Sequence, residues 1–289
     1  MKNEFLVRPD VKGTPKPLSE IGCVAKPLSK VEMLFNMGWV CKSILLIVVL
    51  IGWESYANYL DNALIFPTFS STIVSLWGLM QSGELFVKTG YTLKILGIGY
   101  VAGFTLAAII TILATFNRLG QYVMELFTSI VAPLPAVALL PFAFIWFGLG
   151  NGALLFVLII SVWSPIAQAM HNGFKGVPAT LRMVGKNYEL SGFKYAFKIL
   201  IPAAFASILT GAKIGWAFGW RTLIAAELVA GVSSGKGGMG WMINEAKNNL
   251  DIPVVFGGLL SVIILGLVIE NIVFKQIENR TVKKWGMSS

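Results

Sequence analysis

The chain has 289 residues, of which 56% are hydrophobic and only 13% charged, and its formal net charge is +9. A soluble globular protein carries roughly 25% charged residues, so this composition excludes the ordinary soluble classes. It predicts an all-α polytopic membrane protein, because helices satisfy their own backbone polar groups within lipid. The positive charge gathers beside the apolar segments, so membrane topology explains it better than a nucleic-acid partner, and we expect none.

Residues that could build a metal or redox centre are scarce. Cys23 and Cys41 form no Cys-x-x-Cys pair, and His171 is the single histidine. Zinc sites and Ser-His-Asp triads need clusters of such side chains. We therefore expect no metal ion, disulfide or catalytic residue in this chain.

The chain divides into a basic tail, a membrane domain and a second short tail. Residues 1–42 hold several prolines among lysines and predict a flexible tail without a cleavable signal peptide, residues 43–275 a transmembrane domain, and residues 276–289 a C-terminal tail. A spanning helix needs about 20 largely apolar residues. Six segments meet this criterion, at 43–60, 91–116, 123–147, 152–170, 203–231 and 253–274.

Prolines interrupt the third of these segments. Pro133, Pro135 and Pro141 lie within 123–147. Proline removes a helical hydrogen bond and kinks or breaks a helix. We therefore predict a short interfacial piece followed by a kinked span.

Lysine and arginine near the span ends predict the orientation. They are dense in the N-terminal tail, in the segment 173–202 and in the C-terminal tail, and Arg118 lies in the loop after the second span. Basic loops stay on the cytoplasmic side. We therefore expect a multi-pass protein of the plasma membrane with both termini in the cytoplasm. Residues 73–80, in the loop on the other side, predict an amphipathic helix lying on the outer surface.

The glycine-rich run 231–240 invites comparison with a phosphate-binding loop. That loop needs four residues between its first glycine and Gly-Lys, followed by Ser or Thr. Here only three residues intervene, and Gly237 follows Lys236. The run is also expected outside, where ATP is absent. We expect a turn there, and no ATP hydrolysis by this chain.

Charged side chains within the predicted spans need a reason, because each costs about 2.5–3.5 kcal/mol to insert. Arg221 and Glu227 lie in the fifth span and Lys94 in the second. Arg221 and Glu227 are six residues apart, about 600° of helix, and cannot form a simple pair on one face. Two interpretations stay open. One is a water-accessible pathway in which Arg221, with its neighbour Trp220, attracts an anion; the other is salt bridges between helices or subunits.

The basic segment 173–202 is too polar to lie in hydrocarbon. Within it, apolar side chains recur at spacings of three and four, which predicts a helix over 187–200 with one apolar face. Gly192 allows a bend. Such a helix can lie on acidic lipid or fill a groove on a soluble partner. The side chains on the predicted face are Leu190, Phe193, Phe197 and Leu200.

Several stretches in order resemble one family. The most specific is GWAFGWRTLIAAELV at 215–229. Over roughly 65–286 the chain resembles the permease subunits of binding-protein-dependent ABC importers, in their nitrate, sulfonate and taurine branch. The other matching stretches are 139–142, 146–150, 190–193, 199–202, 208–211 and 282–287.

The resemblance implies a type I importer permease fold whose cytoplasmic coupling helix lies in 173–202 and docks on an ATPase. The family's coupling pattern is Glu-Ala-Ala, three residues, Gly, nine residues, then Ile-x-Leu-Pro. Anchored on Ile199 and Pro202, it places Met183 and Gly185 in the Glu-Ala-Ala positions and Glu189 at the glycine, which puts in doubt which side chains make the contact. The residues expected at the ATPase contact are Asn187, Glu189, Leu190, Ser191, Gly192, Phe193, Lys194, Phe197 and Pro202.

The resemblance also implies a function. It is that of the permease subunit of an ATP-driven importer for a small anionic solute such as a sulfonate, taurine, nitrate or bicarbonate. Two ATP-binding subunits would hold ATP and magnesium, an external binding protein would deliver the solute, and a second permease copy would complete the pathway. Alternatives are a heterocyclic vitamin precursor as substrate, a stand-alone secondary transporter, or a membrane scaffold. The expected pathway residues are Arg221, Trp220, Glu227 and Lys94.

Overall fold

The computed structural model describes residues 38–230 and 237–281. Most of the N-terminal tail (1–37), most of the glycine-rich run (231–236) and the last part of the C-terminal tail (282–289) lie outside these residues, and so do the predictions that fall on them. The described residues form helices joined by turns and short connections, without a strand, which confirms the all-α class. The chain separates into two compact units, residues 1–53 and 54–289, and each is considered by itself.

The described part of the first unit is the beginning of helix α2 (Gly38–Leu60). This helix is apolar and long enough to cross a membrane. Its side chains from Leu45 to Val49 are largely exposed. Exposed apolar side chains of this kind suit a lipid-facing helix.

Helix α7 (Asn151–Lys175) forms the centre of the second unit, between α4 (Glu84–Phe116) and α11 (Phe205–Ala230), on which it packs most extensively. Glycines allow this close approach. A Cβ at Gly103 of α4 would lie 2.9 Å from Cβ of Val162, and one at Gly215 of α11 would lie 2.6 Å from Cγ1 of Ile166. Both contacted side chains are completely buried.

In the described part of the chain, four helical segments are long and apolar enough to cross a membrane: α2, α4, α7 and the continuous helix Ile252–Arg280. The last comprises α13 (Ile252–Val268), η4 (Ile269–Phe274) and α14 (Lys275–Arg280). Two bent helix pairs raise the number to six, as predicted from the sequence. One pair is α5 (Arg118–Val131) with η2 (Ala136–Leu139) and α6 (Leu140–Phe147), and the other is the helical segment 192–203 with α11.

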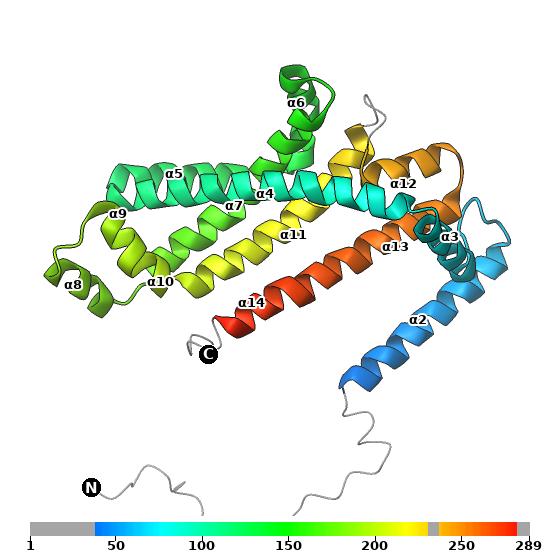
Figure 1. Ribbon diagram of the computed structural model, residues 1–289, viewed down its shortest axis with the longest axis horizontal. Coiled ribbons are helices and arrows are strands. Elements are labelled where there is room, and N and C mark those ends of the chain that lie inside the picture. The colour runs from blue at the N-terminus through cyan, green and yellow to red at the C-terminus, as the bar shows by residue number, and fades with distance from the viewer. Residues whose placement is uncertain (1–37, 231–236, 282–289) are drawn as a thin grey trace, which may run out of the picture. The chain divides into compact units, whose positions relative to one another are not determined.

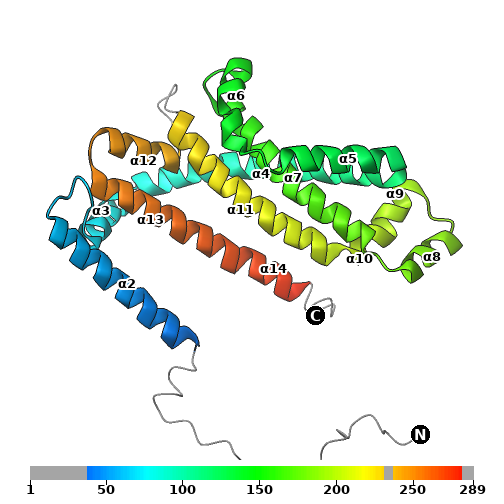
Figure 2. The ribbon, with the colours of Figure 1, turned by 180° about the vertical axis from the view of Figure 1, so that it is seen from behind.

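The bend in the third predicted span is sharper than the expected kink. Its two arms meet at 89°, across the residues that include Pro133 and Pro135. The first arm, α5, has 14 residues and is longer than a short interfacial piece. It lies beside α4 and α6 projects to one side, as Figures 1 and 2 both show.

Apart from η2 and α6, the separate short helices of the second unit lie at its two ends (Figures 1 and 2). The outer-surface helix expected at 73–80 is α3 (Phe69–Gln81), and it shares one end with α12 (Met239–Asn248). The opposite end carries α8 (Ala179–Asn187), α9 (Gly192–Tyr195), η3 (Ala196–Leu200) and α10 (Ile201–Ala203). Segments predicted to lie on one side of the membrane therefore lie at one end. Which end faces the cytoplasm stays a prediction from the charge pattern.

The prediction of one helix over 187–200 is wrong. Helix α8 ends at Asn187, and the N–H groups of Glu189 and Leu190 bond back to the carbonyls of Lys186 and Gly185, both at 2.9 Å. This is a Schellman ending, which needs a left-handed residue, and Glu189 has φ +52°. A new helix, α9, begins at Gly192. The spacing of three and four residues, which holds only within one continuous helix, therefore does not apply across 187–200. Leu200 is buried at 2% exposure, whereas Phe193 and Phe197 are exposed.

Candidate functional site

A cavity of about 500 Å³ lies between α7, α11 and the bend that follows α5. Arg221 on α11 lines it, and its Nε donates a hydrogen bond to the carbonyl of Ala217 at 3.2 Å. The guanidinium carbon is 5.6 Å from the ring centroid of Phe218. The other polar residues of the wall are Ser161, Ser164 and Gln168 of α7 and Thr222 of α11.

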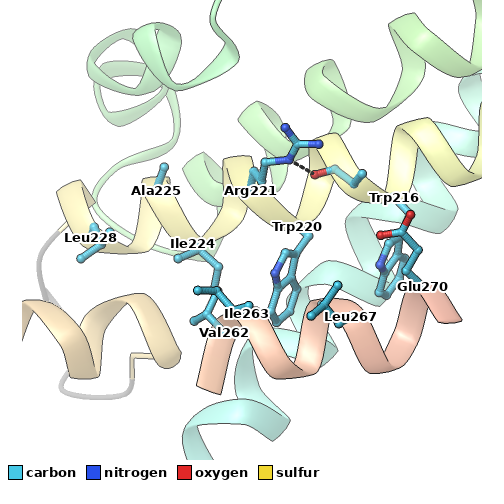
Figure 3. A pocket seen from close by; sticks show the side chains of 12 residues that line it. Trp216, Trp220, Arg221, Ile224, Ala225, Leu228, Val262, Ile263, Leu267 and Glu270 are labelled. Atoms are coloured by element: carbon cyan, nitrogen blue, oxygen red, sulfur yellow. Dashed lines mark hydrogen bonds between the residues drawn. The ribbon is translucent and has the colours of Figure 1, made fainter. Parts of the chain in front are cut away.

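A second cavity, of about 400 Å³, lies between α11 and the α13–η4 helix (Figure 3). Trp220 forms part of its wall and is nearly buried, with its indole nitrogen facing Gly266, where an added Cβ would lie 3.1 Å away. Arg221 and Glu270 also border this cavity. Figure 3 shows the guanidinium group directed away from Glu270 and from α13.

Glu227 lies in neither cavity. Its side chain is buried, with the residue 4% exposed, and accepts hydrogen bonds from the hydroxyl of Thr92 at 3.0 and 3.1 Å and from the backbone N–H of Gly240 at 2.9 Å. The hydroxyl oxygen of Thr92 accepts from the N–H of Met239 at 2.8 Å. Glu227 therefore stabilises the beginning of α12. As the spacing predicted, it does not pair with Arg221.

Lys94 is exposed on α4 and is not among the residues that line the two cavities. The structure thus brings Arg221 and Trp220 to the walls of a cavity, but neither Glu227 nor Lys94. The role of all four in a pathway stays a prediction. A salt bridge between helices, the second interpretation of the charges within the spans, is found at Lys213 of α11. Its ammonium group pairs with the Glu278 carboxylate of α14. Among the described residues, no carboxylate forms such a pair with Arg221.

Sequence reasoning missed the polar wall of the first cavity. Ser161, Ser164 and Gln168 are spaced by three and four residues, so they form a polar stripe along one face of the apolar helix α7. That spacing is the signal that could have identified them. Pro165, beside the stripe, also lines the cavity.

The coupling segment 173–202 presents apolar side chains at the opposite end of the unit from α3 and α12. Phe193 and Phe197 are exposed, and so are Met183 and Tyr188, which the predicted contact set did not include. Gly185 is buried where a Cβ would lie 2.6 Å from Cε2 of Tyr195. A groove of about 460 Å³ runs beside α8. Its walls are Ala179, Arg182, Met183, Lys186, Leu190 and Tyr195.

The remaining residues of the predicted contact set are spread over this end. Asn187 ends α8, Ser191 precedes α9, and Gly192 begins α9 with φ +57°. Lys194 lies in α9 on an exposed position, and Pro202 lies in α10. The structure therefore spreads the set over the end of α8, the connection after it and the segment from α9 to α10, and not over one helix face. Its contact with an ATPase stays a prediction.

Residues that could hold a metal do not cluster in the described part of the chain, where no group of three His, Cys, Asp or Glu side chains converges. His171 of α7 instead hydrogen-bonds Glu125 of α5 at 3.3 Å, and Lys175 pairs with the same carboxylate. These contacts join α5 to the last turns of α7. They are explained by helix packing.

Comparison with known proteins places this geometry in a family. Residues 99–282, which hold both cavities and the coupling segment, match the binding-protein-dependent transport system inner membrane component. A Methanocaldococcus jannaschii protein assigned as an ABC transporter permease is 28% identical over 222 residues, 75% of this chain and 82% of that protein.

Two further relatives carry substrate names. A Bacillus subtilis protein assigned as a transport permease for aliphatic sulfonates is 25% identical over 249 residues, 86% of this chain and 88% of its own length. The taurine transport system permease protein of Escherichia coli K12 is 29% identical over 148 residues, 51% of this chain and 52% of that protein. Because the family match covers more than half of the sequence, the chain belongs to the binding-protein-dependent transport system inner membrane components, the permeases of ABC importers.

Proposed function

We propose that this chain is the permease subunit of an ATP-driven importer that admits a small oxyanion of the sulfonate class. The observation that carries the proposal is the guanidinium of Arg221 in the cavity between α7 and α11. The names of the sulfonate and taurine relatives support the same substrate class. Two ATP-binding subunits with ATP and magnesium, an external binding protein and a second permease copy would complete the transporter.

The chemistry of the cavity suits an oxyanion. A guanidinium group offers several N–H donors in a planar fork that matches sulfonate, carboxylate or nitrate oxygens. The amide of Gln168 and the hydroxyl of Ser164 add neutral donors on the facing wall, and the hydroxyl of Thr222 adds one beside Arg221 on α11. The Ser161 hydroxyl donates to the carbonyl of Leu158 and leaves its oxygen to the wall. A charge in a span is costly unless it is paired or reached by water, and an anion in transit supplies a partner.

A passage must also release what it binds. Conduction requires binding strong enough to admit the solute and weak enough to let it leave. A single cation with neutral donors meets this requirement better than a cluster of cations. We therefore assign substrate selection to the external binding protein and a low-affinity contact to Arg221.

Energy would enter through the coupling segment. Met183, Tyr188, Phe193 and Phe197 offer exposed apolar surface at that end, and the exposed Lys194 lies among them. Such a surface can fill a groove on a soluble subunit. Closure of the two ATPases on ATP would displace α8 and switch the cavity between outward and inward access.

The proposal is tested by reconstitution. The chain is co-expressed with its ATPase and binding protein, purified, and placed in proteoliposomes with ATP inside. Uptake of labelled taurine, an alkanesulfonate, nitrate and a heterocyclic vitamin precursor is then compared. We expect sulfonate uptake that stops without ATP or without the binding protein. Uptake driven by an ion gradient alone would instead establish a secondary transporter, and uptake of the heterocycle alone would overturn the oxyanion assignment.

A further inference from the structure

Arg182 of α8 binds the C-terminal end of α7. Its Nη2 donates hydrogen bonds to the carbonyls of Phe174 at 3.1 Å and Lys175 at 2.7 Å, and its Nε donates to the carbonyl of Val177 at 3.0 Å. The last carbonyls of a helix have no partner within that helix, and a cation there complements the helix dipole. One guanidinium group therefore completes the end of α7 from the neighbouring helix.

The link between the two helices is otherwise short and weakly supported. Only Gly176, Val177 and Pro178 separate α7 from α8. Helix α8 packs on η3 and on Tyr195, mainly through the buried Gly185. The basic neighbour Lys175 is occupied by Glu125 of α5. Arg182 thus joins α8 to the central helix through two hydrogen bonds to its last carbonyls.

Helix α7 also carries one wall of the cavity that Arg221 lines. The polar stripe of Ser161, Ser164 and Gln168 ends about two turns before the carbonyls that Arg182 holds. Pro165 removes one hydrogen bond within the stripe, but α7 contains no proline between Gln168 and Phe174, and a helical stretch with all its hydrogen bonds moves as a rigid element. A displacement of α8 is therefore passed to this wall if α8 stays attached to the end of α7.

We propose that Arg182 is a positioning residue that fixes the ATPase-docking helix α8 to α7, so that ATP-driven movement of α8 reaches the substrate cavity. The inference rests on the proposed function for its physiological meaning. The attachment itself can be tested without transport. Replacement of Arg182 would leave the proposed ATPase-docking surface in place, because the exposed apolar side chains of the coupling segment are unchanged.

The first test measures the attachment. Amide hydrogen exchange of α8 is compared in the purified full-length permease, in nanodiscs and without ATPase, for Arg182→Gln, Arg182→Lys and the control Lys186→Gln. Lys186 lies on the same helix and borders the same groove, but it is exposed. We expect faster exchange of α8 in Arg182→Gln, a smaller effect in Arg182→Lys, which lacks the planar fork, and none in the control. Unchanged exchange in Arg182→Gln would overturn the proposed attachment whether or not the chain transports sulfonates.

The second test measures coupling in the complete transporter. Co-purified ATPase, ATP hydrolysis and solute transported per ATP are measured for the same variants in proteoliposomes. For Arg182→Gln we expect retained ATPase and hydrolysis, with solute per ATP reduced about tenfold, within the usual range of coupling free energies. Arg182→Lys should fall between. Lys247→Gln, a further control at an exposed basic position of α12 at the other end of the unit, should match the unmodified protein. Two results would contradict a linking role for Arg182. One is an unchanged amount of solute per ATP; the other is a loss of co-purified ATPase subunit in proportion to the loss of transport. Failure of the unmodified complex would instead reject the proposed function.

Discussion

The carboxylate of Glu227 lies 2.9 Å from the backbone nitrogen of Gly240, whose N–H donates a hydrogen bond to it. This contact joins the last turn of α11 to the first turn of α12, and Thr92 adds α4 to the same network. The fit is close, since a Cβ at Gly240 would lie 2.6 Å from Cβ of Glu227. The charge that sequence reasoning assigned to a pathway thus has a structural role that accounts for its burial.

Replacement of Glu227 by Ala should destabilise the α11–α12 junction. It leaves the Gly240 N–H and the Thr92 hydroxyl without their acceptor, and a buried unsatisfied group costs roughly 1–3 kcal/mol. Glu227→Gln should cost less, because its amide oxygen can still accept from Gly240. Thermal unfolding of the permease in nanodiscs measures both. The exposed Glu245→Gln on α12 is the control, and equal midpoints for Glu227→Ala and this control would refute the assignment.

Helix α4 offers a matched pair of glycines for testing the α4–α7 packing. An added Cβ at Gly103 meets Cβ of Val162 at 2.9 Å and the carbonyl of Ile159 at 3.3 Å, whereas one at Gly97 meets nothing within 4 Å. Overpacking of a tight interface costs about 1–3 kcal/mol. We expect Gly103→Ala to lower the thermal midpoint and Gly97→Ala to leave it unchanged or raise it. A lower midpoint for Gly97→Ala alone would contradict the observed helix faces.

Glu189 occupies a backbone position that favours glycine. Its φ is +52°, and it is the left-handed residue of the Schellman ending of α8. The left-handed conformation costs a non-glycine residue about 1–2 kcal/mol. Glu189→Gly should therefore stabilise the end of α8, whereas Glu189→Ala, which removes the charge but keeps Cβ, should not. Slower hydrogen exchange of α8 in the glycine variant measures the gain; equal exchange in the two variants would show that backbone strain is absent.

Composition and residue spacing were enough to predict the helical segments and the main break between them. Apolar length identified the helical segments, and prolines located the break after α5. The coupling pattern, aligned on Ile199 and Pro202, placed glycine at Glu189, and the backbone there is left-handed. The alignment therefore held a signal for the helix ending, which the prediction of a helix over 187–200 did not use.

The tertiary partners could not be predicted in the same way. Glu227 accepts a hydrogen bond from the N–H of Gly240 on the next helix, and Arg182 donates hydrogen bonds to carbonyls of α7. These contacts depend on how the chain turns back between helices, and the spacing of apolar residues does not predict such turns. The predicted helix over 187–200 failed for a related reason. Spacing describes a continuous helix and does not register a turn at 188–191 that ends one helix and starts another.

The central claim, that a small oxyanion passes the cavity lined by Arg221, is tested most directly by uptake kinetics. ATP-dependent sulfonate uptake is measured in proteoliposomes for Arg221→Gln and Arg221→Lys, with Arg118→Gln at the start of α5 as the control for lost charge. We expect Arg221→Gln to reduce uptake about tenfold or more while the complex stays assembled and hydrolyses ATP, Arg221→Lys to retain part of it, and Arg118→Gln to retain all of it. Uptake by Arg221→Gln with unchanged kinetics would contradict the account and leave Arg221 with a purely structural role.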